Sequence, residues 1–328
     1  MTDKISERYA AGETNIASID IGSHTARLLI CRRTGSSGLF QPLLRKRAYI
    51  RLAEGFGDQG EENIGPEAIE RTLNALGDFS SIIKEYNAET THAVSTGVMR
   101  DAVNSDRFLD LVYGRTGIKA RVISGEEEAL LTQKGVLHSL DMHSMSPIIF
   151  DLGGGTTEIV SGDENSTEVK SVHIGAAVLT QRYFHSDPPS DERIGALSKY
   201  VDEVLEGAYS RIGYAENDFP MVGTGGTVTT LAAMIKRVDI KDITPDRLNG
   251  LILKRDQIED LFAYMKTLPV AERMRLSSME QGRAGVILAG TMAVIRILYF
   301  FRSIQMMVSL SDILEGILIA FLQGEKDE

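Results

Sequence analysis

The sequence predicts an α/β protein built from two domains with a cleft between them. The chain has 328 residues, which is long for a single hydrophobic core. Short apolar segments typical of strands alternate with segments of helical periodicity, as in α/β proteins. No low-complexity tract or flexible linker separates the two halves, so we expect the domains to pack closely across the cleft.

Hydrophobic periodicity places the elements of each domain. In the first domain, residues 15–130, we expect strands at 16–20, 26–31, 45–52, 91–94 and 120–123 and helices at 66–86, 98–113 and 124–139. In the second domain, residues 131–310, we expect strands at 147–150, 159–160, 221–222 and 306–310 and helices at 192–209, 228–238, 258–267 and 282–300. Residues 1–14 form a polar N-terminal tail, residues 35–38 a turn, and residues 313–321 a final helix.

The pattern at the start of the chain occurs again near its middle. In both places an apolar strand ends in Asp-x-Gly and a second apolar strand follows the turn. The matching positions are Asp20 and Asp151, Gly22 and Gly153, and Thr25 and Thr156. We interpret this as an internal duplication. The alternative is coincidence, because a strand followed by Asp-x-Gly is common.

Composition and charge exclude several classes of protein. The net charge is -11, and an acidic surface repels nucleic acid and anionic membranes, so we expect neither as a partner. Cys31 is the only cysteine, which excludes an intrachain disulfide and a cysteine zinc site. The first 13 residues lack the apolar core of a signal peptide, and the apolar stretch 293–301 is interrupted by Arg296 and too short to span a bilayer. We expect a cytoplasmic protein.

The first glycine turn, residues 20–25, is a candidate phosphate-binding loop. Gly22 would free backbone N–H groups to point at an oxyanion, and Ser23 and Thr25 would add hydroxyl donors. His24 completes the candidate set, although a histidine here is most often an ordinary turn residue. Asp20 ends the strand and is suited to holding a metal through water. The alternative is a plain hairpin.

The second glycine turn, residues 151–158, carries a stronger signal. Three consecutive glycines cost chain entropy, which is easier to explain if the backbone approaches a ligand closely. The candidate phosphate ligands are Gly153, Gly154, Gly155 and Thr156. Asp151 and Glu158 flank the turn, so that one carboxylate can hold magnesium while the other positions water. The alternative is a glycine-rich hairpin with a surface glutamate.

A third glycine turn joins a strand to a helix. The candidate phosphate ligands are Gly223, Thr224, Gly225, Gly226 and Thr227. The N-terminus of a helix binds anions through its free N–H groups and its dipole. The alternative is a tight strand–helix connection without a ligand.

A run of three glutamates opens the helix expected at 124–139. Ser124 and Glu127 fit a capping box, which accounts for Glu127. A carboxylate in the first turn is kept ionised by the helix dipole, which suits a base or a water-positioning residue. The spacing alone leaves the choice among Glu126, Glu127 and Glu128 open.

Basic side chains supply the cations that a phosphate ligand needs. Arg45, Lys46, Arg47 and Arg51 form a cluster in which strand alternation would place the three arginines on one face, usually a solvated one. Arg100 follows a Ser-Thr-Gly turn at a helix start and is the better candidate. We expect Arg100 and Arg51 to bind phosphate.

Together these segments resemble the exopolyphosphatase / guanosine pentaphosphate phosphohydrolase family, which belongs to the superfamily of actin, sugar kinases and heat-shock chaperones. The resemblance runs from Asp20 to Gly316 through IDIGSHTARLLI, IRLAEGFG, AVSTGVMRDA, VISGEEEALL, FDLGGGTTEIV, VGTGGTVTTLAA, GRAGVILAG and VSLSDILEG. It implies two actin-like (ribonuclease H-like) domains with the site between them. It also implies that a C-terminal helix, within residues 311–328, completes the first domain. Longer members have a further helical domain, so this chain looks like a short form.

The resemblance assigns roles to the acidic residues. The family pattern I-S-G-x-E-E-A makes Glu128 the catalytic glutamate, and the glutamate that ends DLGGGTTE is Glu158. The resemblance implies that these two activate or position water, with Asp151 assisting the metal. Together with the positions of Asp20 and Glu158 beside the first two glycine turns, this makes Asp20, Asp151 and Glu158 the expected Mg²⁺ ligands. It also implies a homodimer.

The chain departs from the family pattern at four positions. His24 stands where the family usually has Asn, and Gly285 where it has Asp. Leu310 and Leu314 stand where an Asp and an Arg are usual, although Asp312 lies two residues from the first of them. These changes leave the hydrolytic pair intact and bear on the substrate, the packing of the last helix and the rate.

The function that the sequence predicts is magnesium-dependent phosphoanhydride hydrolysis. The enzyme would release the terminal phosphate of inorganic polyphosphate or the 5′ γ-phosphate of guanosine pentaphosphate, a nucleotide of the stringent response. Two alternatives stay open. One is a sensor that binds guanosine tetra- or pentaphosphate with little turnover, and the other is an actin-superfamily kinase.

Overall fold

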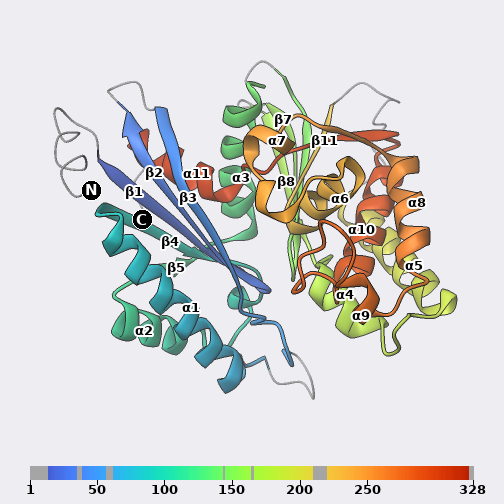
Figure 1. Ribbon diagram of the computed structural model, residues 1–328, viewed down its shortest axis with the longest axis horizontal. Helices are drawn as coiled ribbons and strands as arrows, with labels where there is room; N and C mark the ends of the chain where they lie inside the picture. Colours follow the sequence, from blue (N-terminus) through green and yellow to red (C-terminus); the bar gives the residue numbers. More distant parts are fainter. Residues whose placement is uncertain are drawn as a thin grey trace.

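The computed structural model describes residues 14–34, 39–56, 62–142, 145–163, 166–209 and 220–324. They form two β-sheets, each covered by helices and lying side by side (Figure 1), which confirms the predicted α/β class. The turn expected at 35–38 and residues 1–13 of the expected tail lie outside the described residues. Among the described helices, none is long and apolar enough to cross a membrane.

The first sheet has the strand order β3-β2-β1-β4-β5. Its strands are β1 (Asn15–Ile21), β2 (Thr25–Thr34), β3 (Leu39–Tyr49), β4 (Ala88–Ser95) and β5 (Ala120–Val122). Alternate residues of β1 face opposite sides of the sheet. Ile19 packs in one core with α1 (Pro66–Glu85) and α2 (Ser105–Thr116), whereas Ile16 packs against α11 (Ile313–Leu322). Because helices cover both faces, β1 is apolar along most of its length.

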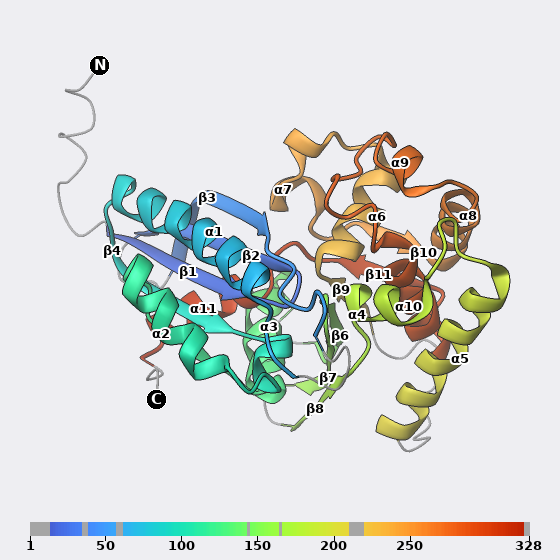
Figure 2. The same ribbon diagram turned by 90° about the horizontal axis from the view of Figure 1, so that it is seen from below.

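The second sheet has the strand order β10-β11-β9-β6-β7-β8. Its strands are β6 (Ile148–Leu152), β7 (Thr157–Asp163), β8 (Ser166–Val172), β9 (Met221–Thr224), β10 (Ile252–Lys254) and β11 (Gln305–Val308). One side is covered by α4 (Ala176–Tyr183), α5 (Asp191–Ala208), α6 (Gly226–Lys236), α8 (Arg255–Met265) and α10 (Ile287–Phe300) (Figure 2). The short helices α7 (Pro245–Leu248) and α9 (Val270–Arg273) belong to the same half of the molecule, and a 3₁₀ turn, η4 (Ile240–Asp242), precedes α7 in the chain. Helix α10 is almost uniformly apolar because it packs against α4, α5, α6 and α8.

Helices α3 (Gly125–Leu140) and α11 pack against each other between the two sheets (Figures 1 and 2). Two glycines permit this close crossing. A Cβ at Gly135 would collide with the carbonyl of Asp312, and a Cβ at Gly316 would collide with the carbonyl of Leu131. A larger side chain at either glycine would separate the helices, whose N-terminal ends carry Glu128 and Asp312.

The two predicted repeats adopt the same local structure. β1–β2 and β6–β7 are antiparallel hairpins. In the first the N–H of Gly22 donates to the carbonyl of Thr25, and in the second the N–H of Gly153 donates to that of Thr156, both at 3.0 Å. β1 then pairs in parallel with β4, and β6 with β9. This correspondence supports the interpretation as an internal duplication.

Two predicted helices begin later than expected. The helix expected at 98–113 is a 3₁₀ turn, η3 (Gly97–Arg100), followed by α2. The interruption occurs because the N–H of Val103 bonds to the carbonyl of Glu62 and not to the preceding helical turn. The helix expected at 282–300 begins only at Ile287, because the residues before it form turns that reach the domain interface.

Candidate active site

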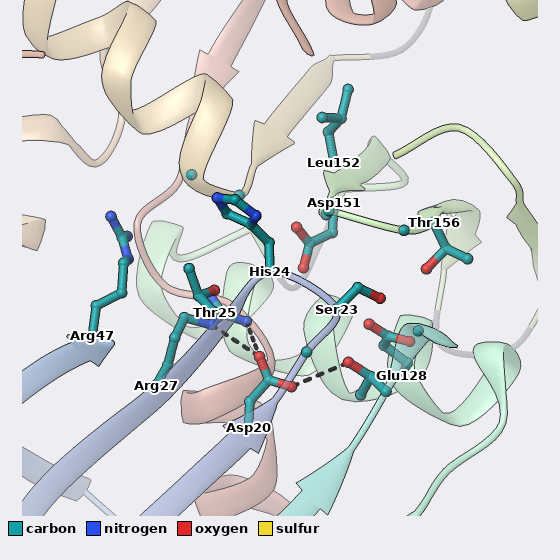
Figure 3. Close-up of a pocket in the computed structure, with 18 of the residues that line it drawn as sticks. Asp20, Ser23, His24, Thr25, Arg27, Arg47, Glu128, Asp151, Leu152 and Thr156 are labelled. Atoms are coloured by element: carbon teal, nitrogen blue, oxygen red, sulfur yellow. Dashed lines mark hydrogen bonds and ion pairs between the residues drawn. The ribbon is translucent and has the colours of Figure 1, made fainter. Parts of the chain in front are cut away.

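A narrow pocket lies between the two domains, where the loops after β1, β6 and β9 meet (Figure 3). Its volume is about 50 Å³. Segments far apart in the sequence therefore share one site. The predicted site residues that line it are Asp20, Ser23, His24, Thr25, Glu128, Asp151, Gly153, Gly154, Gly155, Thr156, Gly225 and Gly226.

The first two glycine loops pack directly against each other. A Cβ at Gly154 would lie 2.6 Å from the Cβ of His24, and a Cβ at Gly155 would lie 2.5 Å from the Oγ of Ser23. Ser23 in turn accepts the N–H of Val98 at 3.0 Å. The consecutive glycines are therefore needed for the approach of one loop to the other, in addition to any approach to a ligand.

The third loop divides into a packing part and a site part. Gly223 lies in β9, where a Cβ would come within 2.7 Å of the Phe150 ring, so its missing side chain serves strand packing. Thr224 is buried in the same strand, and Thr227 is buried in α6. Gly225 has a φ of 94°, which favours glycine, and it precedes the first N–H groups of α6 at the pocket. Only this end of the predicted loop reaches the pocket.

Arg51 lies outside the pocket. β3 ends two residues before it, not at residue 52 as predicted, because Arg51 has a φ of 51° that a strand does not accommodate. Its side chain lines a neighbouring cavity. Arg45 pairs with Glu315, and Arg47 pairs with Glu280 at 2.8 Å. The expectation of a solvated basic face is therefore wrong for Arg45 and Arg47.

Of the three glutamates at the start of α3, Glu128 lines the pocket and its neighbours do not. Ser124 accepts the N–H of Glu127, as the predicted cap requires. The Glu127 carboxylate accepts from Arg121 at 3.0 Å and does not return to the cap, so only half of the capping box forms. Glu126 is exposed. The structure thus separates three residues that spacing alone left equivalent.

Arg100 joins the two glutamates across the domain boundary. Its guanidinium donates to Glu128 at 2.6 Å and, through the other terminal nitrogen, to Thr156 at 3.1 Å and Glu158 at 3.4 Å. Glu158 lies at the second position of β7, where it also accepts from Ser171 at 2.7 Å. Arg100 and Glu158 therefore sit directly behind the pocket, and the guanidinium contacts carboxylates in a place where the sequence predicted a phosphate.

Burial shifts the titration of these carboxylates. Removal from water raises the pKa of Glu128 well above its ordinary value, and the charge of Glu158 adds to the effect while Arg100 opposes it. Burial likewise raises the pKa of Glu158 to about 7 and that of Asp151 to about 8, against the opposing charges of Arg100 and Arg27. The site therefore favours a cation or a proton among its carboxylates.

The oxygen donors fit magnesium that is held partly by substrate. Among the described residues, no group of three His, Cys, Asp or Glu side chains forms a ready metal site. Mg²⁺ typically uses one or two carboxylates together with phosphate oxygens and waters. Asp151 faces the pocket and suits a direct ligand. Asp20 accepts from Arg27 at 2.7 Å and from Thr96 at 3.2 Å, so it suits contact through water. Glu158 is not among the pocket-lining residues.

Three arginines line the pocket without having been selected from the sequence: Arg27, Arg47 and Arg283. Arg27 links Asp20 to Asp312 at the start of α11. Arg283 is only 4% exposed, and its Nε has no hydrogen-bond partner among the described residues. Its guanidinium lies so close to Gly226 that a Cβ there would collide with it. The signals for Arg27 and Arg283 were their positions inside IDIGSHTARLLI and GRAGVILAG, two of the segments that carry the resemblance, whereas Arg47 belongs to the basic cluster that was expected to face solvent.

The departures from the family pattern have structural accounts. Burial lowers the pKa of His24 to about 4, so the ring is neutral, and its Nε2 lies 3.3 Å from the carbonyl oxygen of Gly282. Leu310 and Leu314 are buried in apolar clusters. Asp312 caps α11 and pairs with Arg27, so a carboxylate is present near the pocket although its sequence position differs.

The chain is similar to known proteins over nearly its whole length. The model of the Ppx/GppA phosphatase family matches residues 29–325. Exopolyphosphatase 2 of Mycobacterium tuberculosis is 33% identical over 321 residues, which cover 94% of this chain and 98% of that protein. A guanosine-5′-triphosphate,3′-diphosphate pyrophosphatase of Photobacterium profundum is 29% identical over 254 residues, which cover 75% of this chain and 49% of that protein.

Solved structures agree with this similarity. The Aquifex aeolicus member of the Ppx/GppA family superposes with a TM-score of 0.77 at 30% identity, covering 97% of this chain and all of that one. An exopolyphosphatase of Cytophaga hutchinsonii superposes with a TM-score of 0.84 at 25% identity, covering 95% of this chain and 99% of that one. The predicted pair of actin-like domains is confirmed at the level of the fold. The chain belongs to the Ppx/GppA phosphatase family.

Proposed function

We propose that this enzyme hydrolyses the terminal phosphoanhydride bond of inorganic polyphosphate, of guanosine pentaphosphate, or of both. The observation that carries the proposal is the pair Glu128 and Glu158, which come from different domains and meet on Arg100, Glu128 lining the pocket and Glu158 lying directly behind it. A hydrolase needs carboxylates that can orient water beside bound phosphate. The names of the relatives quoted above point to the same substrates.

Phosphate binding falls to the backbone of the glycine loops. The N–H groups around Gly154 and at the start of α6 supply fixed dipoles for phosphate oxygens, and Ser23 and Thr25 line the same space. The Arg283 guanidinium adds a buried cation with one unpaired N–H. These donors suit a transition state in which negative charge is spread over the transferred phosphoryl group.

Glu128 and Glu158 orient the attacking water, and the ionised member of the pair accepts its proton as the oxygen approaches phosphorus. Asp151, with Asp20 acting through water, would hold Mg²⁺, which offsets charge on the phosphate oxygens. Arg100 stabilises the ionised glutamates between turnovers. Since phosphoryl transfer has little covalent chemistry for the protein to perform, most of the rate comes from this positioning.

The test is phosphate release from long polyphosphate, short polyphosphate and guanosine pentaphosphate, with Mg²⁺ and with chelator, for wild type and Glu128→Gln. Magnesium-dependent release that the substitution reduces supports the proposal. Tight binding without release identifies a sensor, and ADP formed only with an acceptor identifies a kinase. A homodimer also remains an expectation, which sedimentation would test.

A further inference from the structure

A cluster of side chains beside the phosphate pocket joins the two domains. Arg47 and Tyr49 lie at the C-terminal end of β3 in the first domain, and Glu280 lies in the turn before α10 in the second. Arg47 donates to the two carboxylate oxygens of Glu280 at 3.0 and 2.8 Å, and the Tyr49 hydroxyl donates to the same carboxylate. Arg47 lines the pocket, whereas Glu280 and Tyr49 are not among the residues that line it. Glu280 can therefore influence the pocket through its partners.

The turn that carries Glu280 also carries Arg283, the buried cation of the pocket. The Arg283 N–H donates to the carbonyl of Glu280 at 2.8 Å, and the Arg283 guanidinium carbon lies 5.9 Å from the centre of the Tyr49 ring. A Cβ at Gly282 would lie 2.6 Å from the same ring, so glycine permits the turn to approach β3 this closely. Arg47 and Arg283 therefore line one pocket from opposite domains.

The charge of Glu280 offsets the repulsion between these two guanidinium groups. Burial and the charge of Arg47 lower the pKa of Arg283, and the Glu280 carboxylate opposes them. Burial also disfavours the charge of Glu280, but its contacts with Arg47 and Tyr49 outweigh burial and hold its pKa below the ordinary value. Glu280 is therefore ionised near neutral pH, and its single charge lets both guanidinium groups share the pocket while the cluster stays positive.

Glu280 orients the Arg47 guanidinium without covering it. Both hydrogen bonds to the carboxylate come from Nη1, whereas a guanidinium has several further N–H donors in a rigid plane. Arg47 extends from β3 beside the pocket (Figure 3), and its side chain is 27% exposed. The contact with Glu280 fixes this long side chain before a ligand arrives, which reduces the side-chain entropy lost when phosphate binds.

We propose that Arg47 is a further phosphate-binding residue and that Glu280 positions it. Glu280 holds the Arg47 guanidinium at the pocket, where it and Arg283 donate to one phosphate group from opposite domains. The inference rests on the proposed function, because it takes the pocket to bind phosphate. The contrary role for Glu280 is a carboxylate that occupies Arg47 until the substrate displaces it. The two roles predict opposite effects of removing the Glu280 charge.

The experiment measures KM and kcat with Mg²⁺, and calorimetric affinity with chelator, for tetrapolyphosphate and guanosine pentaphosphate. Arg47→Gln should raise KM and Kd by roughly tenfold or more, because a hydrogen bond to a charged group is lost. Glu280→Gln keeps the shape of the side chain but removes the charge that holds Arg47, so it should raise both constants several-fold with little change in kcat. Tyr49→Phe removes one contact of Glu280 and should act in the same direction more weakly.

A double-mutant cycle separates positioning from a structural role. In the Arg47→Gln background, Glu280→Gln should have no further effect on KM or Kd, because Glu280 acts through Arg47. Glu272→Gln, at an exposed glutamate of α9, is the matched control for loss of a negative charge in the same domain and should leave both constants unchanged.

Tighter binding by Glu280→Gln overturns the inference, because it identifies Glu280 as a competitor of the substrate. Unchanged affinity in Arg47→Gln, or equal effects of Glu280→Gln in the two backgrounds, overturns it as well and makes the cluster structural. A wild type that binds these ligands without releasing phosphate overturns the proposed hydrolysis alone, since the affinities still decide on Arg47 and Glu280. A wild type that binds neither ligand overturns both.

Discussion

Replacing Glu158 with Gln should reduce activity. It should also stabilise the ligand-free protein relative to wild type, by an amount that grows as pH rises. The carboxylate is 2% exposed, and burial raises its pKa from an ordinary 4.5 to about 7. At 1.36 kcal/mol per pKa unit, that rise corresponds to roughly 3 kcal/mol of unfolding free energy. Glutamine can keep the hydrogen bonds to Ser171 and Arg100 without carrying the buried charge.

The sign of this pH dependence follows from the direction in which the pKa of Glu158 is shifted. A carboxyl group with a raised folded-state pKa favours the folded state when protonated, and this contribution is lost as pH rises from about 4.5 through about 7. The wild-type protein loses this contribution as pH rises, whereas Glu158→Gln does not, because glutamine carries no ionisable group. The difference in stability should therefore be near zero at pH 4.5, grow through pH 7, and remain constant above it.

Thermal denaturation without Mg²⁺ or substrate, between pH 4.5 and 8.5, measures this difference. For domains of this size 1 kcal/mol changes Tm by roughly 2–4 °C, so the two proteins should differ by several degrees at pH 8. Glu126→Gln, an exposed neighbour of the site helix, should show no such trend. A difference that is flat with pH, or that decreases as pH rises, would mean that Arg100 fully compensates the buried charge and would refute the reasoning.

Three further predictions concern the same site. Glu128→Gln should lower turnover by ~10²–10⁴-fold and keep the fold, whereas Glu127→Gln should not affect turnover; phosphate-release kinetics of both variants decide which glutamate acts. Gly154→Val should abolish substrate binding even where circular dichroism reports a native fold, because the new side chain meets His24. Normal substrate binding by a folded variant would contradict the close approach of Gly154 to His24. Arg100→Ala should weaken substrate binding and lower stability by about 3–5 kcal/mol above pH 8, and by less at pH 6, where Glu158 regains its proton; Arg100→Lys should restore part of both losses. A salt series with parallel melting curves separates a ligand contact from a structural one.

Several features of this protein could be read from local sequence patterns. The alternation of apolar segments predicted the α/β class, and the repeated strand–Asp–x–Gly pattern predicted two hairpins that prove to have the same hydrogen bond. Such features depend on residues close together in the chain, since turn chemistry and capping act within a few residues. The same is true of Ser124, whose cap on the N–H of Glu127 formed as predicted.

Other features required contacts that sequence spacing does not encode. Spacing along α3 left Glu126, Glu127 and Glu128 equivalent, and only the packing of α3 against the second sheet selects Glu128 for the pocket. The sequence predicted a phosphate contact for Arg100, but its carboxylate partners could not be read from it, because Glu128 and Glu158 lie 28 and 58 residues away in the sequence.

The sequence by itself determined the class of the fold, the positions of the glycine turns and the resemblance that names the family, because these depend on local residue order. Tertiary structure alone decided which cations reach the pocket, as with Arg283, and that the first two glycine loops press on each other. It also decided that a second cavity lies beside the phosphate pocket and shares Ser23 and His24 with it. The physical reason is that burial, charge pairing and cavity shape arise only when distant segments exclude water together.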